Sequence, residues 1–390
     1  MNNLCLEYGY KSVHHYGEEL CGDHVEVAEQ NENSIVIVLA DGLGSGVKAS
    51  ILSTLTSKII ATMLAEGMSI DECVSTIAAT LPVCSVRGVA YSTFTIMHII
   101  ENETIEIIQY DNPEVIMLRD GVNFEYPRTE MTIDGKKIYK TIQHLQEGDV
   151  FIAMSDGCPH AGAHNTYNYG WKREDIIGFM EVMNMNGLAA KNLATMLIEE
   201  CEKLYENEPS DDATACVVKI RKREPINILF GPPLNPEDES SMFSLFFSQE
   251  GRHVVCGGTT SKLVAKFLGE DIETVMNTEE TDIPPMAKID GVDLVTEGVV
   301  TINRVTEYAK DYLGENERFE EWYFKKNGAA RICKLLFEEA TDINFYVGKA
   351  INPAHQNPNL QININIKMSL VEDLSKSLRE LGKRVKVSYF

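Results

Sequence analysis

Two strongly apolar runs, each leading into Asp-Gly, constrain this sequence most. Residues 35–40 (IVIVLA) lead into Asp41, and residues 150–155 (VFIAMS) lead into Asp156. Apolar runs of this length, bounded by turn residues, predict buried strands. A carboxylate at the tip of such a strand is held rigidly, and the glycine after it lets a backbone or a ligand approach closely. The sequence therefore predicts two strand ends that each carry one fixed carboxylate.

Short strands and long helices follow one another between residues 34 and 220. Turns at residues 101–103 and 111–113 predict hairpins, so the neighbouring strands should be antiparallel. The order lacks the strand–helix–strand rhythm of a doubly wound parallel sheet. We expect an α+β fold of antiparallel sheets flanked by helix pairs, with strands at 34–41, 91–100, 104–110, 114–120, 149–156 and 213–220, and helices at 46–65, 69–80, 172–184 and 187–206.

A second region follows a break in this pattern at residues 221–241. A basic cluster, four prolines and an acidic Ser-rich patch interrupt the periodicity there. We expect one domain over 1–222, a linker over 223–240, and a second domain over 241–390. The second domain should be α/β with a regulatory or docking role, with a strand at 253–258 and helices at 261–269, 298–313, 328–340 and 369–381.

Two local features of the second region leave alternatives open. Residues 256–262 (CGGTTSK) could present backbone N–H groups to an anion at a helix start. Thr260 or Ser261 as an ordinary helix N-cap explains the same residues, and we favour this interpretation. The polar loop at 352–358 is either functional or only a connection.

Composition excludes several classes of protein. The net charge is −24, from 59 acidic and 35 basic residues, and such a surface repels a phosphate backbone, so we expect no nucleic-acid partner. No apolar run approaches about 20 residues and no basic-then-apolar leader is present, so we expect no membrane partner and a cytoplasmic location. The nine cysteines form no C-x-x-C pair, which favours reduced thiols over disulfides or zinc sites.

Four acidic motifs occur in the first region. Taken alone, each Asp-Gly is more often a turn than a site. Carboxylates converging on one rim would repel one another unless cations hold them, and oxygen ligands select magnesium or manganese over zinc. The motifs are Gly22-Asp23, Asp41-Gly42-Leu43-Gly44-Ser45-Gly46, Ser155-Asp156-Gly157 and Asp211-Asp212-Ala213-Thr214.

A dinucleotide-binding loop is the competing interpretation of residues 41–46. The spacing is G-x-G-x-G rather than G-x-G-x-x-G. Asp41 would lie against the pyrophosphate, and no strand ending in an acid follows about 20 residues later. We therefore reject this alternative.

In their order, the motifs resemble the bacterial metal-dependent serine/threonine phosphatases of the stage II sporulation protein E type, relatives of protein phosphatase 2C. The resemblance covers about residues 8–220. Residues 110–121 also look like a hairpin of that family, where a Gly-His-Pro-Pro turn is more usual. The matching segments are GDHVEV (22–27), VLADGLGSGVKAS (38–50), FIAMSDG (151–157) and DDATACVV (211–218).

The resemblance implies an α-β-β-α sandwich of two antiparallel sheets between helix pairs, with a two-metal site at one end. In it, Asp41 would bridge two Mn²⁺ or Mg²⁺ ions and Gly42 would offer its carbonyl oxygen. Asp156 and Asp211 would bind one ion, and Asp23 would bind the other directly or through water. Asp212 would support the site rather than ligate. The catalytic set would then be Asp41, Asp156 and Asp211, and no organic cofactor is implied.

The activity implied is hydrolysis of phosphoserine or phosphothreonine in a partner protein by a metal-activated water. Leu43 stands where relatives in the wider family often have a histidine that protonates the leaving group. His14, His15 and His24 are near the site in sequence and are candidates for this acid. An inert phosphatase-like scaffold and a small-molecule phosphatase are the alternatives. The sequence leaves a homodimer open.

Overall fold

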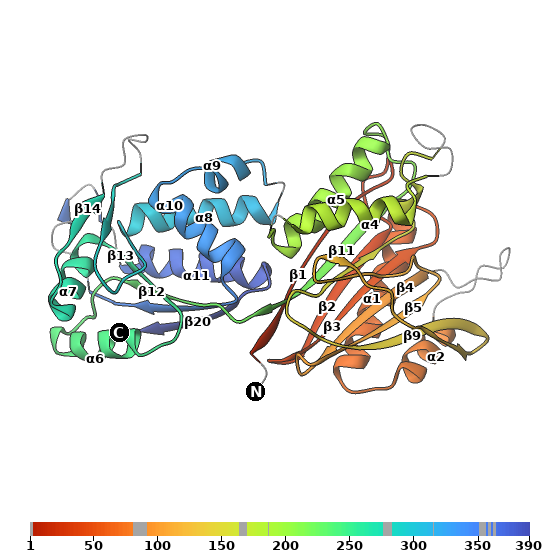
Figure 1. Ribbon diagram of the computed structural model, residues 1–390, viewed down its shortest axis with the longest axis horizontal. Coiled ribbons are helices and arrows are strands. Elements are labelled where there is room, and N and C mark those ends of the chain that lie inside the picture. Colours follow the sequence, from red (N-terminus) through yellow and green to blue (C-terminus); the bar gives the residue numbers. More distant parts are fainter. Residues whose placement is uncertain are drawn as a thin grey trace. The chain divides into compact units, whose positions relative to one another are not determined.

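The computed structural model describes residues 3–80, 92–163, 170–185, 187–275, 283–314, 316–350, 356–357, 360–361 and 364–390. The chain divides into two compact units, Met1–Lys222 and Arg223–Phe390 (Figure 1). Only Arg223 and Glu224 separate the last strand of the first unit from the first strand of the second.

Two antiparallel sheets form the centre of the first unit. Their strands are β1 (Leu4–Val13), β2 (Asp23–Asn31), β3 (Ser34–Gly42), β4 (Ser92–Ile100), β5 (Thr104–Tyr110), β6 (Ile116–Arg119), β7 (Val122–Asn123), β8 (Thr129–Ile133), β9 (Lys136–His144), β10 (Val150–Met154) and β11 (Ala213–Lys222). One sheet has the order β2-β3-β4-β5-β9-β8 and the other β1-β11-β10-β6-β7. The turn at residues 101–103 joins β4 and β5, which pair antiparallel as predicted. The hairpin expected at residues 111–113 is wrong, because β5 and β6 on either side of this turn belong to different sheets. Strands β8 and β9 form a further antiparallel hairpin.

Helices cover the outer faces of the two sheets. These helices are α1 (Gly46–Ala65), α2 (Ile70–Thr80), α4 (Arg173–Asn184) and α5 (Ala190–Leu204), and a short helix α3 (Gly157–His160) follows β10. Residues of α1 and α2 share a core with the six-stranded sheet, and residues of α4 and α5 share one with the five-stranded sheet. A third core lies between the sheets. The prediction of an α+β sandwich is confirmed.

The alternation of side chains along β3 explains why this strand is apolar throughout. Val36, Val38 and Ala40 pack in the core shared with the helices, whereas Ile37 and Leu39 pack between the sheets. Successive residues of a strand point to opposite faces, and here both faces are covered. A strand buried on both faces cannot slip in register without exposing apolar side chains, so its end is fixed in space.

The structure corrects one expectation about apolar segments. Among the described residues, α1 alone has the length and apolar composition of a membrane-crossing helix, although the sequence analysis expected no such run. Its buried residues include Leu52, Ile60 and Leu64, which pack with β3 in the core of the first unit.

The second unit contains a mostly parallel sheet. Its strands are β12 (Pro225–Phe230), β13 (Arg252–Cys256), β14 (Glu273–Val275), β15 (Met286–Lys288), β16 (Leu294–Thr296), β17 (Asp342–Val347) and β20 (Arg384–Tyr389), in the order β14-β15-β16-β13-β12-β17-β20. The five strands from β16 to β20 are parallel, and β14 and β15 form an antiparallel edge. Strands β18 (Gln356–Asn357) and β19 (Leu360–Gln361) pair with each other as a separate two-stranded antiparallel ribbon.

Helices and apolar cores lie on both faces of this sheet, which confirms a second α/β domain. The helical segments are a 3₁₀ turn (Pro236–Asp238), α6 (Glu239–Phe247), α7 (Gly258–Leu268), α8 (Val299–Leu313), α9 (Phe319–Tyr323), α10 (Gly328–Cys333) with a π-helical continuation (Lys334–Glu339), and α11 (Ile364–Glu380).

Two expectations for the second region are wrong. The expected linker at 223–240 contains β12, an interior strand of the sheet, whose apolar run INILF follows Pro225 and pairs with β13 on one side and β17 on the other. Neither Thr260 nor Ser261 caps α7. The N-cap is Gly257, whose φ of 114° favours glycine, and Ser261 Oγ donates back to the Gly257 carbonyl at 2.8 Å. Most of the polar loop at 352–358 lies outside the described residues.

A buried ion pair in the first unit should contribute strongly to its stability. Asp149 is fully buried and accepts from Arg119 Nε at 2.8 Å, from Arg119 Nη2 at 2.7 Å and from the Gln146 amide at 2.8 Å. The Arg119 side chain is 15% exposed and would keep its bond to the His144 carbonyl oxygen, so we expect Asp149→Ala to cost about 3 kcal/mol of unfolding free energy, the lower end for a broken buried pair. Glu200→Ala, which removes the exposed Lys203 pair, should cost less than about 0.5 kcal/mol.

The two tryptophans allow the first unit to be followed by itself. Trp171 is buried in the first unit and Trp322 in the second. In a Trp322→Phe background, urea unfolding followed by tryptophan fluorescence reports only on the unit that contains Asp149. Equal midpoints for Asp149→Ala and Glu200→Ala would contradict the prediction.

Candidate metal centre

Each of the two sheets delivers carboxylates to one rim of the sandwich. Asp23 opens β2 and pairs with Asp41 at the end of β3. Asp156 follows β10, and Asp211 and Asp212 precede β11, the neighbour of β10. The hydroxyl of Ser155, the residue before Asp156, donates to Asp23 Oδ2 at 2.7 Å, so the two sets meet. The structure brings together all five predicted acidic residues.

Two of these carboxylates are buried with an oxygen that lacks a partner. Asp23 is 5% exposed: its Oδ2 accepts from Ser155 Oγ at 2.7 Å, and its Oδ1 has no hydrogen-bond donor in the described part of the chain. Asp212 is 3% exposed: its Oδ1 accepts from the His15 amide at 3.0 Å, and its Oδ2 likewise lacks a donor. Buried carboxylate oxygens are costly without a partner. A divalent cation would supply that partner, so these residues fit a metal site.

The electrostatics of the rim favour the same interpretation. Burial raises the pKa of Asp23, and the nearby Asp212 and Asp156 carboxylates raise it further. Burial and the carboxylates of Asp23, Asp156 and Asp211 raise the pKa of Asp41. The pKa of Asp211 is also raised, first by burial and then by Asp156. Without a cation the rim therefore resists full ionisation, and a divalent ion would reverse this effect.

The glycines that follow Asp41 and Asp156 are required by packing. A Cβ on Gly42 would lie 2.2 Å from the Ala49 carbonyl oxygen in α1, and a Cβ on Gly157 would lie 2.1 Å from the Asp212 carbonyl oxygen. The Asp-Gly pairs thus mark places where another backbone passes directly over the strand end. The direction of the Gly42 carbonyl oxygen toward an ion stays a prediction.

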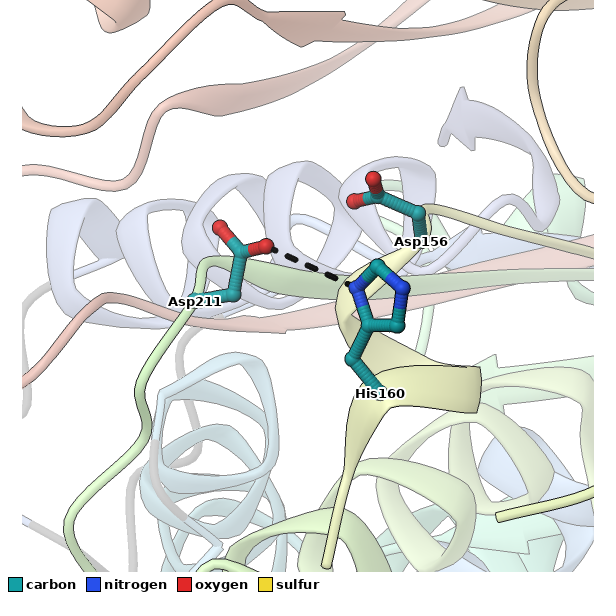
Figure 2. A group of neighbouring side chains, drawn as sticks. All are labelled: Asp156, His160 and Asp211. Carbon is teal, nitrogen blue, oxygen red and sulfur yellow. Dashed lines mark ion pairs between the residues drawn. The ribbon is translucent and has the colours of Figure 1, made fainter. Parts of the chain in front are cut away.

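One member of the site was missed by the sequence analysis. His160 ends α3, four residues after Asp156, and its Nδ1 lies 3.9 Å from Asp211 Oδ2 (Figure 2). One ligand atom each from Asp156, His160 and Asp211 can be chosen so that all three lie within 4.8 Å of one another. The sequence contained a signal for this residue: Asp156 and His160 are spaced Asp-x₃-His directly after a buried strand. Residues four apart lie on the same face of a helix, so this spacing places the two side chains together.

The histidines that the sequence analysis considered lie elsewhere. His24 Nε2 contacts Glu26 Oε2 at 3.1 Å, and His24 is adjacent to Asp23 along a strand, so the two side chains point to opposite faces. The His15 ring bonds to the Tyr16 carbonyl oxygen at 2.8 Å, although its amide reaches Asp212. Each of these two rings thus has a partner outside the acidic rim, and the third candidate, His14, is exposed.

Cys158 belongs to the packing of the site rather than to its chemistry. Its thiol is fully buried, donates to the Thr214 carbonyl oxygen at 3.6 Å, and has a pKa raised by the Cys201 thiol and by burial. A thiol held in this protonated form is a poor nucleophile.

Comparison with known proteins finds similarity over about half of the chain. Residues 31–221 match the family model of Stage II sporulation protein E (SpoIIE). Stage II sporulation protein E of Bacillus subtilis (strain 168) is 22% identical over 213 residues, which are 54% of this chain and 25% of that protein. The chain thus spans about a quarter of the length of this curated relative.

Solved structures resemble the same part of the chain. The phosphatase domain of the cell fate determinant SpoIIE from Bacillus subtilis, in a crystal form without domain swapping, has a TM-score of 0.42 and 21% identity, covering 57% of this chain and 95% of that one. The catalytic domain of the serine/threonine phosphatase PstP, in complex with two manganese ions, has a TM-score of 0.40 and 17% identity, covering 56% and 99%.

Carboxylate repulsion at the rim predicts an unusual effect of pH on the metal-free protein. Because the pKa of Asp41 is raised on folding, the native state binds more protons than the unfolded state, and stability falls as pH rises above about 4. Asp41→Asn removes this ionisation, so in EDTA it should raise the melting temperature, and by more at pH 7 than at pH 5.

The matched control is Asp134→Asn, in an exposed turn where φ is 48° and asparagine is equally suited. It should leave the melting temperature unchanged at both pH values. A metal-free Asp41→Asn protein that is less stable than the wild type at pH 7 would refute the assignment of repulsion to this rim.

Proposed function

We propose, from the membership of residues 31–221 in the SpoIIE family, that the first unit hydrolyses phosphoserine or phosphothreonine in a partner protein. The observation that carries this proposal is the pair of buried, unpartnered oxygens, Asp23 Oδ1 and Asp212 Oδ2, at a rim where Asp41, Asp156 and Asp211 also converge. Such a rim is suited to divalent cations, and we infer two ions, Mn²⁺ or Mg²⁺.

Each carboxylate has a role that agrees with its place in the sheets. Asp41, at the end of β3 and opposite Asp23, would bridge the ions, with the Gly42 carbonyl oxygen as a further ligand. Asp156 and Asp211, on the five-stranded sheet, would hold one ion, and Asp23 would hold the other. Asp212 is fixed by the His15 amide and would support the site.

The chemistry divides between the ions and the protein. Bound divalent ions lower the pKa of water and neutralise phosphate oxygens, which allows in-line attack on phosphorus without a covalent enzyme intermediate. The chain's own residues fix the carboxylates: the Ser155 hydroxyl orients Asp23, and the Ser155 side chain in turn accepts from the Thr214 amide at 2.8 Å. This bond network joins the two sheets at the reacting rim.

The net charge and the second unit indicate the partners and the location of the protein. A net charge of −24 disfavours nucleic acid, and we propose a cytoplasmic protein whose second unit regulates the first or docks its substrate. An inert scaffold is the weaker alternative, because no acidic motif is lost from the sequence. A small-molecule phosphatase would use the same residues and is distinguished by substrate.

Removal of single carboxylates should separate ligands from supports. Asp41→Asn and Asp156→Asn should each lower manganese-dependent hydrolysis of p-nitrophenyl phosphate by about 10²-fold or more, because a ligand charge is lost while the strand cores are unchanged. Asp212→Asn should be milder, and Asp134→Asn should be neutral. Near-normal turnover of Asp41→Asn at modest metal concentration would exclude the proposed site.

Chelation and substrate class provide a second test. Excess EDTA should abolish hydrolysis of phosphoserine and phosphothreonine peptides, and added Mn²⁺ should restore it, because the site has no nucleophilic thiol to replace the ions. Phosphate release is measured with each peptide and with a small phosphate ester. Full turnover in EDTA would refute metal dependence, and activity restricted to the small ester would favour the small-molecule alternative.

A further inference from the structure

The position of His160 is built into the fold rather than left to an exposed loop. Helix α3 begins immediately after Asp156, and the His160 amide donates to the Asp156 carbonyl oxygen at 3.0 Å. Gly157 packs against the Asp212 backbone with no room for a Cβ, and Tyr205 Oη donates to the Gly157 carbonyl oxygen at 2.7 Å. The start of the helix is therefore fixed against the residues that precede β11.

The far side of the same helix is also held. The Trp171 amide donates to the Pro159 carbonyl oxygen at 2.8 Å, and a Cβ on Gly170 would lie 2.2 Å from that oxygen. Cys158 is buried between these contacts. These contacts fix the backbone from which the His160 side chain projects, and its ring lies beside Asp156 and Asp211 (Figure 2).

We propose that the His160 imidazole is a third protein ligand of the ion held by Asp156 and Asp211, and that it makes this position prefer Mn²⁺ over Mg²⁺. This inference rests on the proposed metal-dependent function. An independent observation points to a cation at the same rim: Asp23 and Asp212, both more than nine-tenths buried, each have an oxygen without a donor among the described residues.

The spacing of the three side chains suits one ion. Ligand atoms on opposite sides of a Mg²⁺-sized ion are about 4.2 Å apart, because each bond is about 2.1 Å long. The ligand atoms of Asp156, His160 and Asp211 are up to 4.8 Å apart, which is only slightly more than about 4.2 Å. Small rotations of the side chains would bring these atoms to bonding distance from one ion. Larger backbone movement is unnecessary.

The identity of the donor atom decides which ion is favoured. Mg²⁺ demands oxygen ligands in near-ideal octahedral geometry and gives up its water reluctantly. First-row transition ions accept imidazole nitrogen more readily, so one nitrogen among carboxylates shifts the balance away from Mg²⁺. The competing explanation is a plain ion pair between His160 and Asp211, which at their 58% and 39% side-chain exposure would contribute little.

Pulsed electron paramagnetic resonance of the full chain loaded with Mn²⁺ tests the proposal directly. The wild type should show modulation from a directly bound ¹⁴N nucleus, and His160→Asp should bind Mn²⁺ without it. His24→Gln is the control, because that ring contacts Glu26 instead, and it should keep the nitrogen signal. Circular dichroism checks that each variant is folded.

Competition between ions gives a second readout. When Mn²⁺ binding is titrated against Mg²⁺, His160→Asp should lower the preference for Mn²⁺, because a carboxylate replaces the imidazole nitrogen. Bound Mn²⁺ with no nitrogen signal in the wild type, or an unchanged preference in His160→Asp, would overturn this inference and leave the phosphatase proposal intact. Absence of any tight Mn²⁺ binding would overturn both.

Discussion

Mutual repulsion among carboxylates at one rim is the constraint on which the rest of the first unit depends. Asp41 and Asp156 come from different sheets, yet their carboxyl groups meet. Flexible loops would relieve such repulsion by moving apart. Here both residues end or follow strands whose side chains are buried on both faces, so the apolar cores hold the charges together. The energy of hydrophobic burial is thus what keeps the acidic rim ready for a cation.

Sequence was informative where a residue's role depends on its immediate neighbours. The apolar runs before Asp41 and Asp156 predicted strand ends, and the turn at residues 101–103 predicted the β4–β5 hairpin. The similar turn at 111–113 did not predict correctly, because the strands on either side of it enter different sheets. The glycines after the two aspartates were expected to allow close approach, and the structure identifies the approaching groups as the backbones of Ala49 and Asp212. These groups come from distant parts of the chain, which a local pattern cannot identify.

Where sequence failed, the missing information was tertiary. His160 looks like one histidine among nine until α3 brings its ring back toward Asp211. The run at 225–230 follows a proline and several charges, so it was assigned to a linker, although two parallel neighbours make it a central strand. Parallel pairing is formed by segments far apart in sequence and leaves no turn signature. In the same unit, Lys367 donates to the carbonyl oxygens of Gly348 and Ala350, which lie 19 and 17 residues earlier in the chain. Burial lowers the pKa of Lys367 to about 8.

Strand β11 has a consequence for how the first unit folds. This strand pairs with β1 from Leu4↔Lys222 to Val13↔Ala213, and among the described strands β1 has no other neighbour in its sheet. The first strand of this unit must therefore wait for the last one, about 200 residues later in the chain, and pairing over such a distance is slow. Asp211 and Asp212 immediately precede β11, so the rim gains its last two carboxylates together with this long-range pairing.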